Sequence, residues 1–174
     1  TALHQITQAL LRWMAPFLSF TAEEAWKIVG NSETIFLEKF LDLPEGDDAL
    51  LAKWSRIREI RDVVNKDIET VRGEGKVGAS LQAEVTISAQ HEDLALLQTL
   101  ADDLKFVLIT SAAKAVAAAP DAQALAVEVK PSEAAKCERC WHYRDDVGVN
   151  PAHPTLCGRC DSNLHGEGEV RSKA

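Results

Sequence analysis

The stretch CERCWHYRDDVGVNPAHPTLCGRC, residues 137–160, contains all four cysteines of a 174-residue chain. They form two C-x2-C pairs with sixteen residues between the pairs. Two thiolates three positions apart can reach one ion from a tight turn, and two such turns complete a tetrahedron around zinc. The spacing is typical of structural zinc sites, which leave no position open for a catalytic water. The pattern therefore predicts one structural Zn²⁺ bound by Cys137, Cys140, Cys157 and Cys160.

Other uses of the cysteines agree less well with the sequence. Disulfide frameworks are typical of tiny secreted scaffolds, whereas this chain is long enough for a hydrophobic core and shows no secretory signal. Thioredoxin-like redox chemistry needs one C-x-x-C near a βαβ pattern rather than two in a stretch rich in Gly, Pro and His. Histidine is also a zinc ligand, but four thiolates already fill a tetrahedral shell. We therefore leave three histidines unassigned: His142, His153 and His165.

Cations and aromatic residues surround the predicted ligands. Lys136, Arg139 and Arg159 lie beside cysteines and can offset the negative charge that four thiolates place on the site. The segment also presents Trp141, Tyr143 and Arg144, a combination that suits stacking on unpaired RNA bases. The same tryptophan could instead cover the metal as part of a miniature core. The residues alone leave both roles of Trp141 open.

Hydrophobic periodicity predicts helices in the first part of the chain. Residues 1–17 and 48–71 both repeat apolar side chains at helical spacing. Pro16 should kink or end the first helix. The segment TAEEAW has the pattern of a capping box, with Thr21 as the N-cap of the next helix. GEGKVG, residues 73–78, matches a dinucleotide-binding glycine pattern, but a helix precedes it and a strand follows, so we expect only a turn.

The period changes after residue 78. AEVTIS, KFVLITSAA and ALAVEV predict strands, and HEDLALLQTLADDL predicts a helix between the first two. We therefore expect a mainly α fold with a small α+β module. The expected parts are a helical portion at 1–78, an α+β junction module at 79–130 and a zinc-binding tail at 131–174.

Charge restricts the kind of nucleic-acid contact that the chain can make. The net charge is −8, but residues 130–174 are balanced, so the acidic excess lies in residues 1–129. An acidic protein binds nucleic acid poorly without a local site. Cations on the predicted helix at 48–71 are interleaved with acids, which favours a solvated face over phosphate contacts. No apolar run reaches the ~18 residues of a membrane helix.

Four blocks in order carry a family resemblance: LLRWMAPFLSFTAEEAW, RDVVNKDIETVR, KVGASLQAEVTI and KCERCWHY with CGRC. Over most of its length the chain resembles the C-terminal part of bacterial isoleucyl-tRNA synthetases. The first two blocks are shared more loosely with the valyl, leucyl and methionyl relatives, and the cysteine block singles out the isoleucyl family. The resemblance implies the end of a helical anticodon-binding bundle, a small α/β module and a four-cysteine zinc-knuckle domain.

The resemblance also implies functions. Cys137, Cys140, Cys157 and Cys160 correspond to the family's zinc ligands. The tail is expected to engage the anticodon stem-loop of tRNA, with Trp141 stacking on a base and Arg139 and Arg144 contacting phosphates. The full-length protein would be a monomeric, cytoplasmic ligase that charges tRNA with isoleucine at the expense of ATP.

The nucleotide-binding HIGH and KMSKS motifs of the catalytic domain do not occur in this sequence, and neither does an editing domain. We therefore expect a non-catalytic piece of a longer chain, as the missing initiator Met also indicates. Two alternatives follow from the cysteine segment. It also resembles the finger of formamidopyrimidine-DNA glycosylases, although Thr1 replaces their N-terminal proline nucleophile. A zinc-stapled protein-interaction module would suit the acidic part of the chain.

Overall fold

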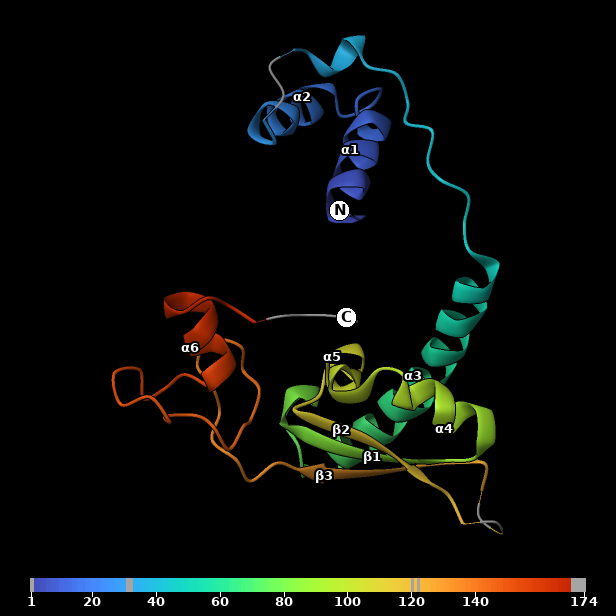
Figure 1. Cartoon of the computed structure of the whole chain (residues 1–174), viewed down its shortest axis with the longest axis vertical. Coiled ribbons are helices and arrows are strands. Elements are labelled where there is room, and N and C mark those ends of the chain that lie inside the picture. Colours follow the sequence, from blue (N-terminus) through green and yellow to red (C-terminus); the bar gives the residue numbers. More distant parts are fainter. Residues whose placement is uncertain (1, 31–32, 120, 122, 170–174) are drawn as a thin grey trace. The chain divides into compact units, whose positions relative to one another are not determined.

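The computed structural model describes residues 2–30, 33–119, 121 and 123–169, which form six α-helices and one three-stranded sheet. The chain divides into two compact units, Thr1–Asp47 and Asp48–Ala174. Figure 1 shows the elements of each unit. Within the described ranges, no helix combines the length and the apolar character needed to span a bilayer.

The first unit is a helical hairpin closed by a short turn. It contains α1 (Ala2–Met14), α2 (Ser19–Ile28) and a 3-10 turn (Ile35–Leu37). Its small core consists of Leu11, Ala15, Ala22, Trp26 and Ile35. The apolar face predicted for α1 is solvent-exposed within this unit, from 47% at Trp13 to 78% at Leu3. The reason is that α2 and the 3-10 turn cover the side of α1 that carries Leu11.

Of the two helix ends predicted in this unit, the end of α1 is confirmed and the start of α2 is wrong. α1 ends at Met14, just before Pro16, as expected. The Thr21 N-cap is wrong, because α2 begins at Ser19 and Leu18 occupies the N-cap position without a side-chain cap. The Ser19 hydroxyl instead donates to the carbonyl of Ala15 at 3.0 Å, which joins the start of α2 to the turn before it.

The second unit is built on a long helix packed against a sheet. α3 (Asp48–Gly73) agrees with the helix predicted at 48–71. The central strand β1 (Ala83–Ala89) pairs in parallel with β2 (Ala112–Ala117) and antiparallel with β3 (Leu125–Pro131). Alternation along β1 buries one face and leaves the other partly exposed. The buried face shares one core with α3, whose contributors are Ile57, Ile60, Val64 and Ile68.

The segment between β1 and β2 corrects one prediction. KFVLITSAA was expected to be a strand, but α5 (Leu104–Leu108) is helical and β2 starts only at Ala112. Leu104 and Leu108 lie four residues apart, so a helix places both in the core, where each is 2% exposed. The helix predicted before them is divided into α4 (His91–Gln98) and a 3-10 turn (Ala101–Asp103).

The glycine-rich segment after α3 is a turn, as predicted. Gly73 is the last residue of α3, and Gly75 has a φ of 74°, which glycine adopts without strain. A 3-10 turn (Ser80–Gln82) then leads into β1. No helix N-terminus follows these glycines, so the segment lacks the geometry of a dinucleotide site.

An ion pair joins α3 to α4. The Arg56 guanidinium donates to both carboxylate oxygens of Asp93, at 2.8 and 2.7 Å. The hydrogen bond from Arg56 holds the pKa of Asp93 below its ordinary value, and burial opposes this only in part. We expect Asp93→Asn to lower the free energy of unfolding at neutral pH by about 0.5–1 kcal/mol, because the pair is partly solvated.

The pH dependence of this effect has a defined sign. A carboxylate with a lowered folded-state pKa stabilises the fold above its unfolded value, about 3.9, and the stabilisation is lost as pH falls through the folded pKa. Urea unfolding of the wild type and Asp93→Asn should therefore differ at pH 7 and converge in acid. Asp62→Asn, at an exposed position of α3, is the matched control. A difference that persisted unchanged in acid would contradict the assignment.

The C-terminal segment after β3 has little regular structure. Lys136 and Tyr143 form an isolated antiparallel bridge, and α6 (Gly158–His165) is its only helix within the described residues. The compact units divide at residue 47, whereas the sequence prediction divides domains at residue 78. The difference arises because α3 supplies one side of the core that also contains β1.

Candidate metal centre and RNA-binding surface

The four cysteine sulfurs converge on one point. Their Sγ atoms all lie within 4.8 Å of one another, and none forms a disulfide. Cys140 Sγ lies 3.7 Å from Cys157 Sγ. Sulfurs on a zinc tetrahedron with bonds of ~2.3 Å are about 3.8 Å apart. Cys137, Cys157 and Cys160 are fully buried. This donor set therefore fits a closed zinc site.

Backbone hydrogen bonds hold the first cysteine pair in a tight turn. The N–H of Cys137 donates to the carbonyl of His142, and the N–H of Trp141 donates back to the carbonyl of Cys137, both at 2.9 Å. The N–H of Cys157 donates to Cys137 Sγ at 3.4 Å. This last bond links the two halves of the site directly.

The second pair is placed by the start of α6. Cys157 is the N-cap residue, and Cys160 follows in the first turn. The N–H of Gly158, the residue after Cys157, donates to Asp146 Oδ2 at 3.2 Å. A Cβ at Gly158 would lie 3.0 Å from that oxygen, so close approach explains the glycine. No sequence pattern predicted that Asp146 would bind the backbone next to the second cysteine pair.

The environment of the sulfurs differs between cysteines. Burial disfavours the Cys137 thiolate, but backbone N–H groups, chiefly those of Cys140 and Cys157, lower its pKa to about 6. Burial raises the pKa of Cys140 and Cys157. The cluster therefore gains from a cation, because thiolates are the metal-binding form. Arg139 Nη1 supplies part of that positive charge by donating to Cys160 Sγ at 3.5 Å.

The other two cations expected beside the ligands have different contacts. Lys136 Nζ lies 5.7 Å from the centre of the Trp141 ring. Arg159 pairs with Glu169 at 2.6 Å and lies over the ring of Phe106 at 4.8 Å. Phe106 belongs to α5, so Arg159 joins the tail to the α/β part of the unit.

His142 is a second anchor between the tail and α5. Its buried ring meets Phe106 edge-on, with the ring centres 5.7 Å apart. Nδ1 lies 3.1 Å from the carbonyl oxygen of Cys140, and since a carbonyl only accepts, Nδ1 carries the proton. Burial lowers the pKa of His142, which keeps the ring neutral. Its role here is packing rather than coordination.

Trp141 projects from the knuckle in a strained conformation. Its side chain is exposed, at 59%, and its φ is 64°, in the left-handed region that bulky residues avoid. Beside the ring, a pocket of about 260 Å³ separates the knuckle from the segment before β1. Its lining includes Gly78, Gln82, Lys136 and Tyr143. Backbone strain at an exposed aromatic next to a cation is typical of ligand-contacting sites.

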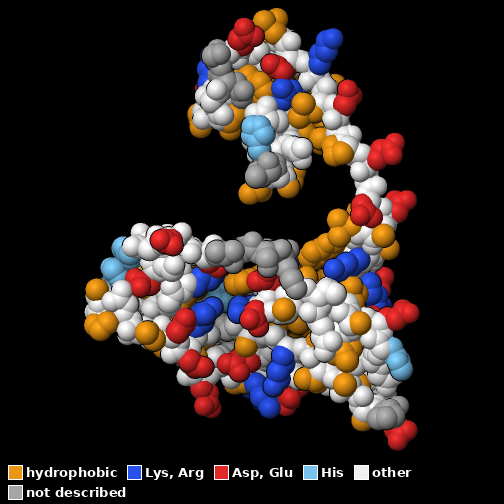
Figure 2. Space-filling model, in the orientation of Figure 1, with side chains coloured by type: hydrophobic (Ala, Val, Ile, Leu, Met, Phe, Trp, Pro, Cys, Tyr) orange, Lys and Arg blue, Asp and Glu red, His pale blue; other side chains and the backbone are white. Residues whose placement is uncertain are grey.

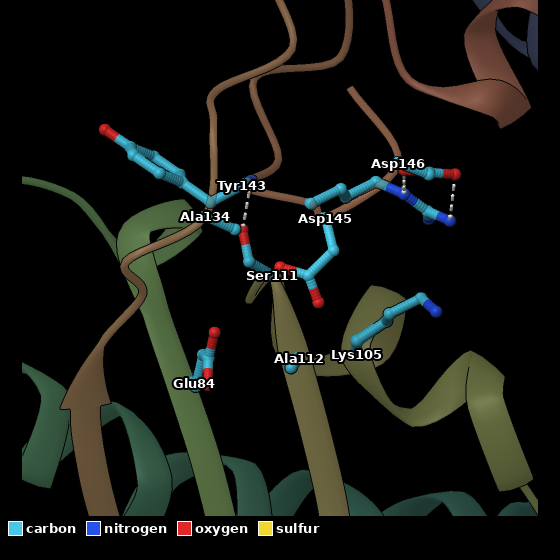
Figure 3. Close-up of a pocket in the computed structure, with 9 residues that line it drawn as sticks. Glu84, Lys105, Ser111, Ala112, Ala134, Tyr143, Asp145 and Asp146 are labelled. Carbon is cyan, nitrogen blue, oxygen red and sulfur yellow. Dashed lines mark hydrogen bonds and ion pairs between the residues drawn. The ribbon is translucent and has the colours of Figure 1, made fainter. Parts of the chain in front are cut away.

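Arg144 lines a second pocket, together with Ser111, Tyr143 and Asp146, and Figure 3 draws this pocket. Its guanidinium donates to both oxygens of Asp146, at 2.8 and 3.1 Å, and these bonds lower the pKa of Asp146. The Tyr143 N–H donates to Ser111 Oγ at 2.6 Å, which attaches the knuckle to the start of β2. The pocket drawn there, about 320 Å³, also contains Glu84. Its lining therefore mixes cations with carboxylates, which also include Asp145 and Asp146.

Comparisons with known proteins agree with this geometry. Residues 1–87 match the anticodon-binding domain of tRNA ligase, and residues 135–163 match a zinc finger found in FPG and IleRS. The isoleucine–tRNA ligase of Cupriavidus taiwanensis is 61% identical over 99% of this chain and 18% of its own length. Those of Thiobacillus denitrificans and Bordetella avium are 56% and 54% identical over 99% and 100% of this chain, and 18% and 19% of their lengths.

The chain thus spans less than a fifth of the length of these curated relatives. Their agreement confirms the resemblance to isoleucyl-tRNA synthetases and supports neither the glycosylase nor the interaction-module alternative. Since the anticodon-binding model covers half of the chain, this chain belongs to the family of tRNA-ligase anticodon-binding domains, and it carries the zinc-finger segment found in isoleucine–tRNA ligases.

Proposed function

We propose that this chain is the tRNA-binding C-terminal part of an isoleucine–tRNA ligase, and that it recognises the anticodon stem-loop without catalysing a reaction. The full-length protein would charge tRNA with isoleucine, using ATP at sites outside this chain. The observation that carries the proposal is the occurrence of both family segments, in order, in one chain. By the same resemblance, the protein acts as a cytoplasmic monomer.

One Zn²⁺ is proposed at Cys137, Cys140, Cys157 and Cys160. When bound, it cross-links the two C-x2-C turns and leaves no coordination position for a substrate. The proposal is supported by the convergence of four sulfurs and by the hydrogen bond from Arg139 to Cys160. The metal's task is structural: a knuckle this small buries too little apolar surface to fold by itself.

RNA recognition is proposed for the surface around Trp141. The exposed ring offers a face for an unpaired base, and the neighbouring pocket can take the edge of the base. Lys136 lies close enough to serve a phosphate beside the stacked base. Arg139 and Arg144 remain proposed phosphate contacts, with Arg144 the weaker because Asp146 already neutralises it.

The domain organisation is part of the same proposal. We assign residues 1–78 to the helical anticodon-binding bundle, 79–130 to the α+β junction module and 131–174 to the zinc-binding tail. Residues 1–78 lie within the segment that matches the anticodon-binding model, and the finger model begins at residue 135. α3 would then belong to the bundle by its match to the anticodon-binding model, although in the structure it packs against the junction module.

The experiment that tests the function is binding of the zinc-loaded chain to the anticodon stem-loop of an isoleucine tRNA, measured at several salt concentrations. We expect saturable binding whose logarithmic affinity falls with the logarithm of salt, by about 0.7 per neutralised phosphate of a single strand. A stem-loop with a different anticodon should bind more weakly. Equal affinity for both loops would contradict anticodon recognition, and no binding to either would contradict an RNA-binding role for this part.

A further inference from the structure

The pocket beside Trp141 has one wall from the knuckle and one from the segment that leads into β1. This segment contributes Gly78, Ala79, Leu81 and Gln82 to the lining. Backbone hydrogen bonds hold its last residue: the N–H of Gln82 donates to the carbonyl of Ala79 at 2.9 Å, and the carbonyl of Gln82 accepts from the N–H of Ser132 at 2.7 Å. Gln82 therefore has a defined place in the wall of the pocket.

Three side chains line the pocket from the knuckle: Lys136, Trp141 and Tyr143. Lys136 and Tyr143 are partners in the isolated antiparallel bridge, so their side chains lie on the same side of the backbone. Lys136 also lies beside the Trp141 ring, with Nζ 5.7 Å from the ring centre. Two aromatic rings and one cation around one pocket suit the flat face and the phosphate of an unpaired nucleotide.

The amide group of Gln82 has a fixed orientation. The N–H of Gly78 donates to Gln82 Oε1 at 2.9 Å. Since a backbone N–H can only donate, the atom that it meets is the amide oxygen and not the amide nitrogen. Nε2 carries two N–H groups, and neither donates to any residue that the structure describes. Gln82 therefore offers hydrogen-bond donors to a ligand in the pocket, whereas its acceptor is already in use.

Charge alone does not select one base over another in this part of the chain. Figure 2 shows acidic and basic side chains interspersed over the drawn face of the second unit. Contacts with phosphates carry no information about base identity. The Tyr143 hydroxyl can donate or accept, so it suits keto and amino groups equally. Discrimination between bases in this pocket therefore falls to the Gln82 amide.

We propose that Gln82 reads the edge of the unpaired base that stacks on Trp141 and favours a keto base over an amino base. Nε2 can donate to O6 of guanine or O4 of uracil. Adenine and cytosine carry amino donors at these places, which cannot accept from Nε2. The inference rests on the proposed RNA-binding function of this surface and adds the class of base that the surface selects.

The test uses anticodon stem-loops of an isoleucine tRNA in which each anticodon base is exchanged in turn for the keto or amino base of the same ring size. Fluorescence anisotropy measures their affinities for the zinc-loaded chain. We expect the wild type to favour the keto base at one position, by roughly 2- to 12-fold, the effect of one hydrogen bond. Trp141→Ala should bind all the loops more weakly.

Gln82→Glu gives the sharper result. It replaces Nε2 by an oxygen at nearly unchanged size, and the carboxylate still accepts from the N–H of Gly78. The preference at the same position should therefore invert toward the amino base, with zinc content and the unfolding transition as in the wild type. Gln123→Glu adds the same charge at an exposed position before β3 and is the matched control, with the wild-type preference expected.

A second readout does not depend on anticodon binding. In NMR spectra, uridine monophosphate should shift the Gln82 side-chain amide and the Trp141 indole N–H, whereas cytidine monophosphate should shift only the indole. These shifts without stem-loop binding would contradict anticodon recognition and retain the base site.

Three results would overturn the role of Gln82 while stem-loop binding still supports the RNA-binding function. They are a wild type without a keto preference at any position, a Gln82→Glu variant with the wild-type preference, and equal amide shifts with both nucleotides. An inversion in Gln123→Glu as well would reduce the effect to one of added charge.

Discussion

Cys157→Ser should abolish stoichiometric zinc binding and unfold the tail while leaving the α/β part of the unit intact. Cys157 contributes one buried sulfur and also the N–H that bonds to Cys137 Sγ. Metal binding to knuckles of this kind supplies about 10–16 kcal/mol of folding free energy. The core shared by α3 and the sheet contains no cysteine, so its stability does not depend on the metal.

Two measurements together check this expectation. Elemental analysis with thiol titration should fall from one zinc and four chelation-released thiols in the wild type to almost no zinc in the variant. Amide hydrogen exchange should lose protection in residues 135–165 and keep it in β1. Thr155→Ser, an exposed position in the same loop, is the control and should retain zinc. A Cys157→Ser chain that kept one zinc would rule out a site made of four cysteines.

Trp141→Ala should weaken binding of the anticodon stem-loop by about 1–3 kcal/mol, or roughly 5- to 150-fold, because it removes a stacking face. The exposed ring leaves little apolar burial to lose, and the backbone strain at φ 64° is the same for alanine. We therefore expect the zinc content and the unfolding transition to stay as in the wild type. Fluorescence anisotropy of a labelled stem-loop measures the effect.

Substitutions at the same position separate stacking from structural roles. Trp141→Phe keeps an aromatic face and should retain most of the affinity. Trp141→Gly relieves the left-handed strain but removes the ring, so it should bind as weakly as the alanine variant. Val149→Ala, at a site 72% exposed in the same tail, is the control for non-specific effects. An unchanged affinity in Trp141→Ala, with zinc retained, would make the ring a cover of the knuckle.

Local patterns predicted much of this protein. The helix at 48–71 and the strands at 83–88 and 124–129 follow from apolar periods that nearby residues repeat, and the structure agrees with each. Where tertiary contacts compete with local preference, the prediction failed. KFVLITSAA has strand-forming residues. It is helical at its start because a helical turn places both Leu104 and Leu108 in the hydrophobic core, and their burial stabilises the fold. Thr21 had a capping pattern, but the turn around Pro16 lets α2 start two residues earlier.

The sequence by itself determined that the four cysteines gather, because two C-x2-C turns can meet around one ion whatever the rest of the chain does. Only the tertiary structure decided what the knuckle rests on and which side chains it leaves free. Ser111 and Tyr143 are 32 residues apart, and no local sequence pattern predicts the hydrogen bond between them. The same docking leaves the Trp141 ring outside the core and occupies Arg144 with Asp146. Contacts between distant residues depend on the folded path of the backbone, which short-range spacing does not encode.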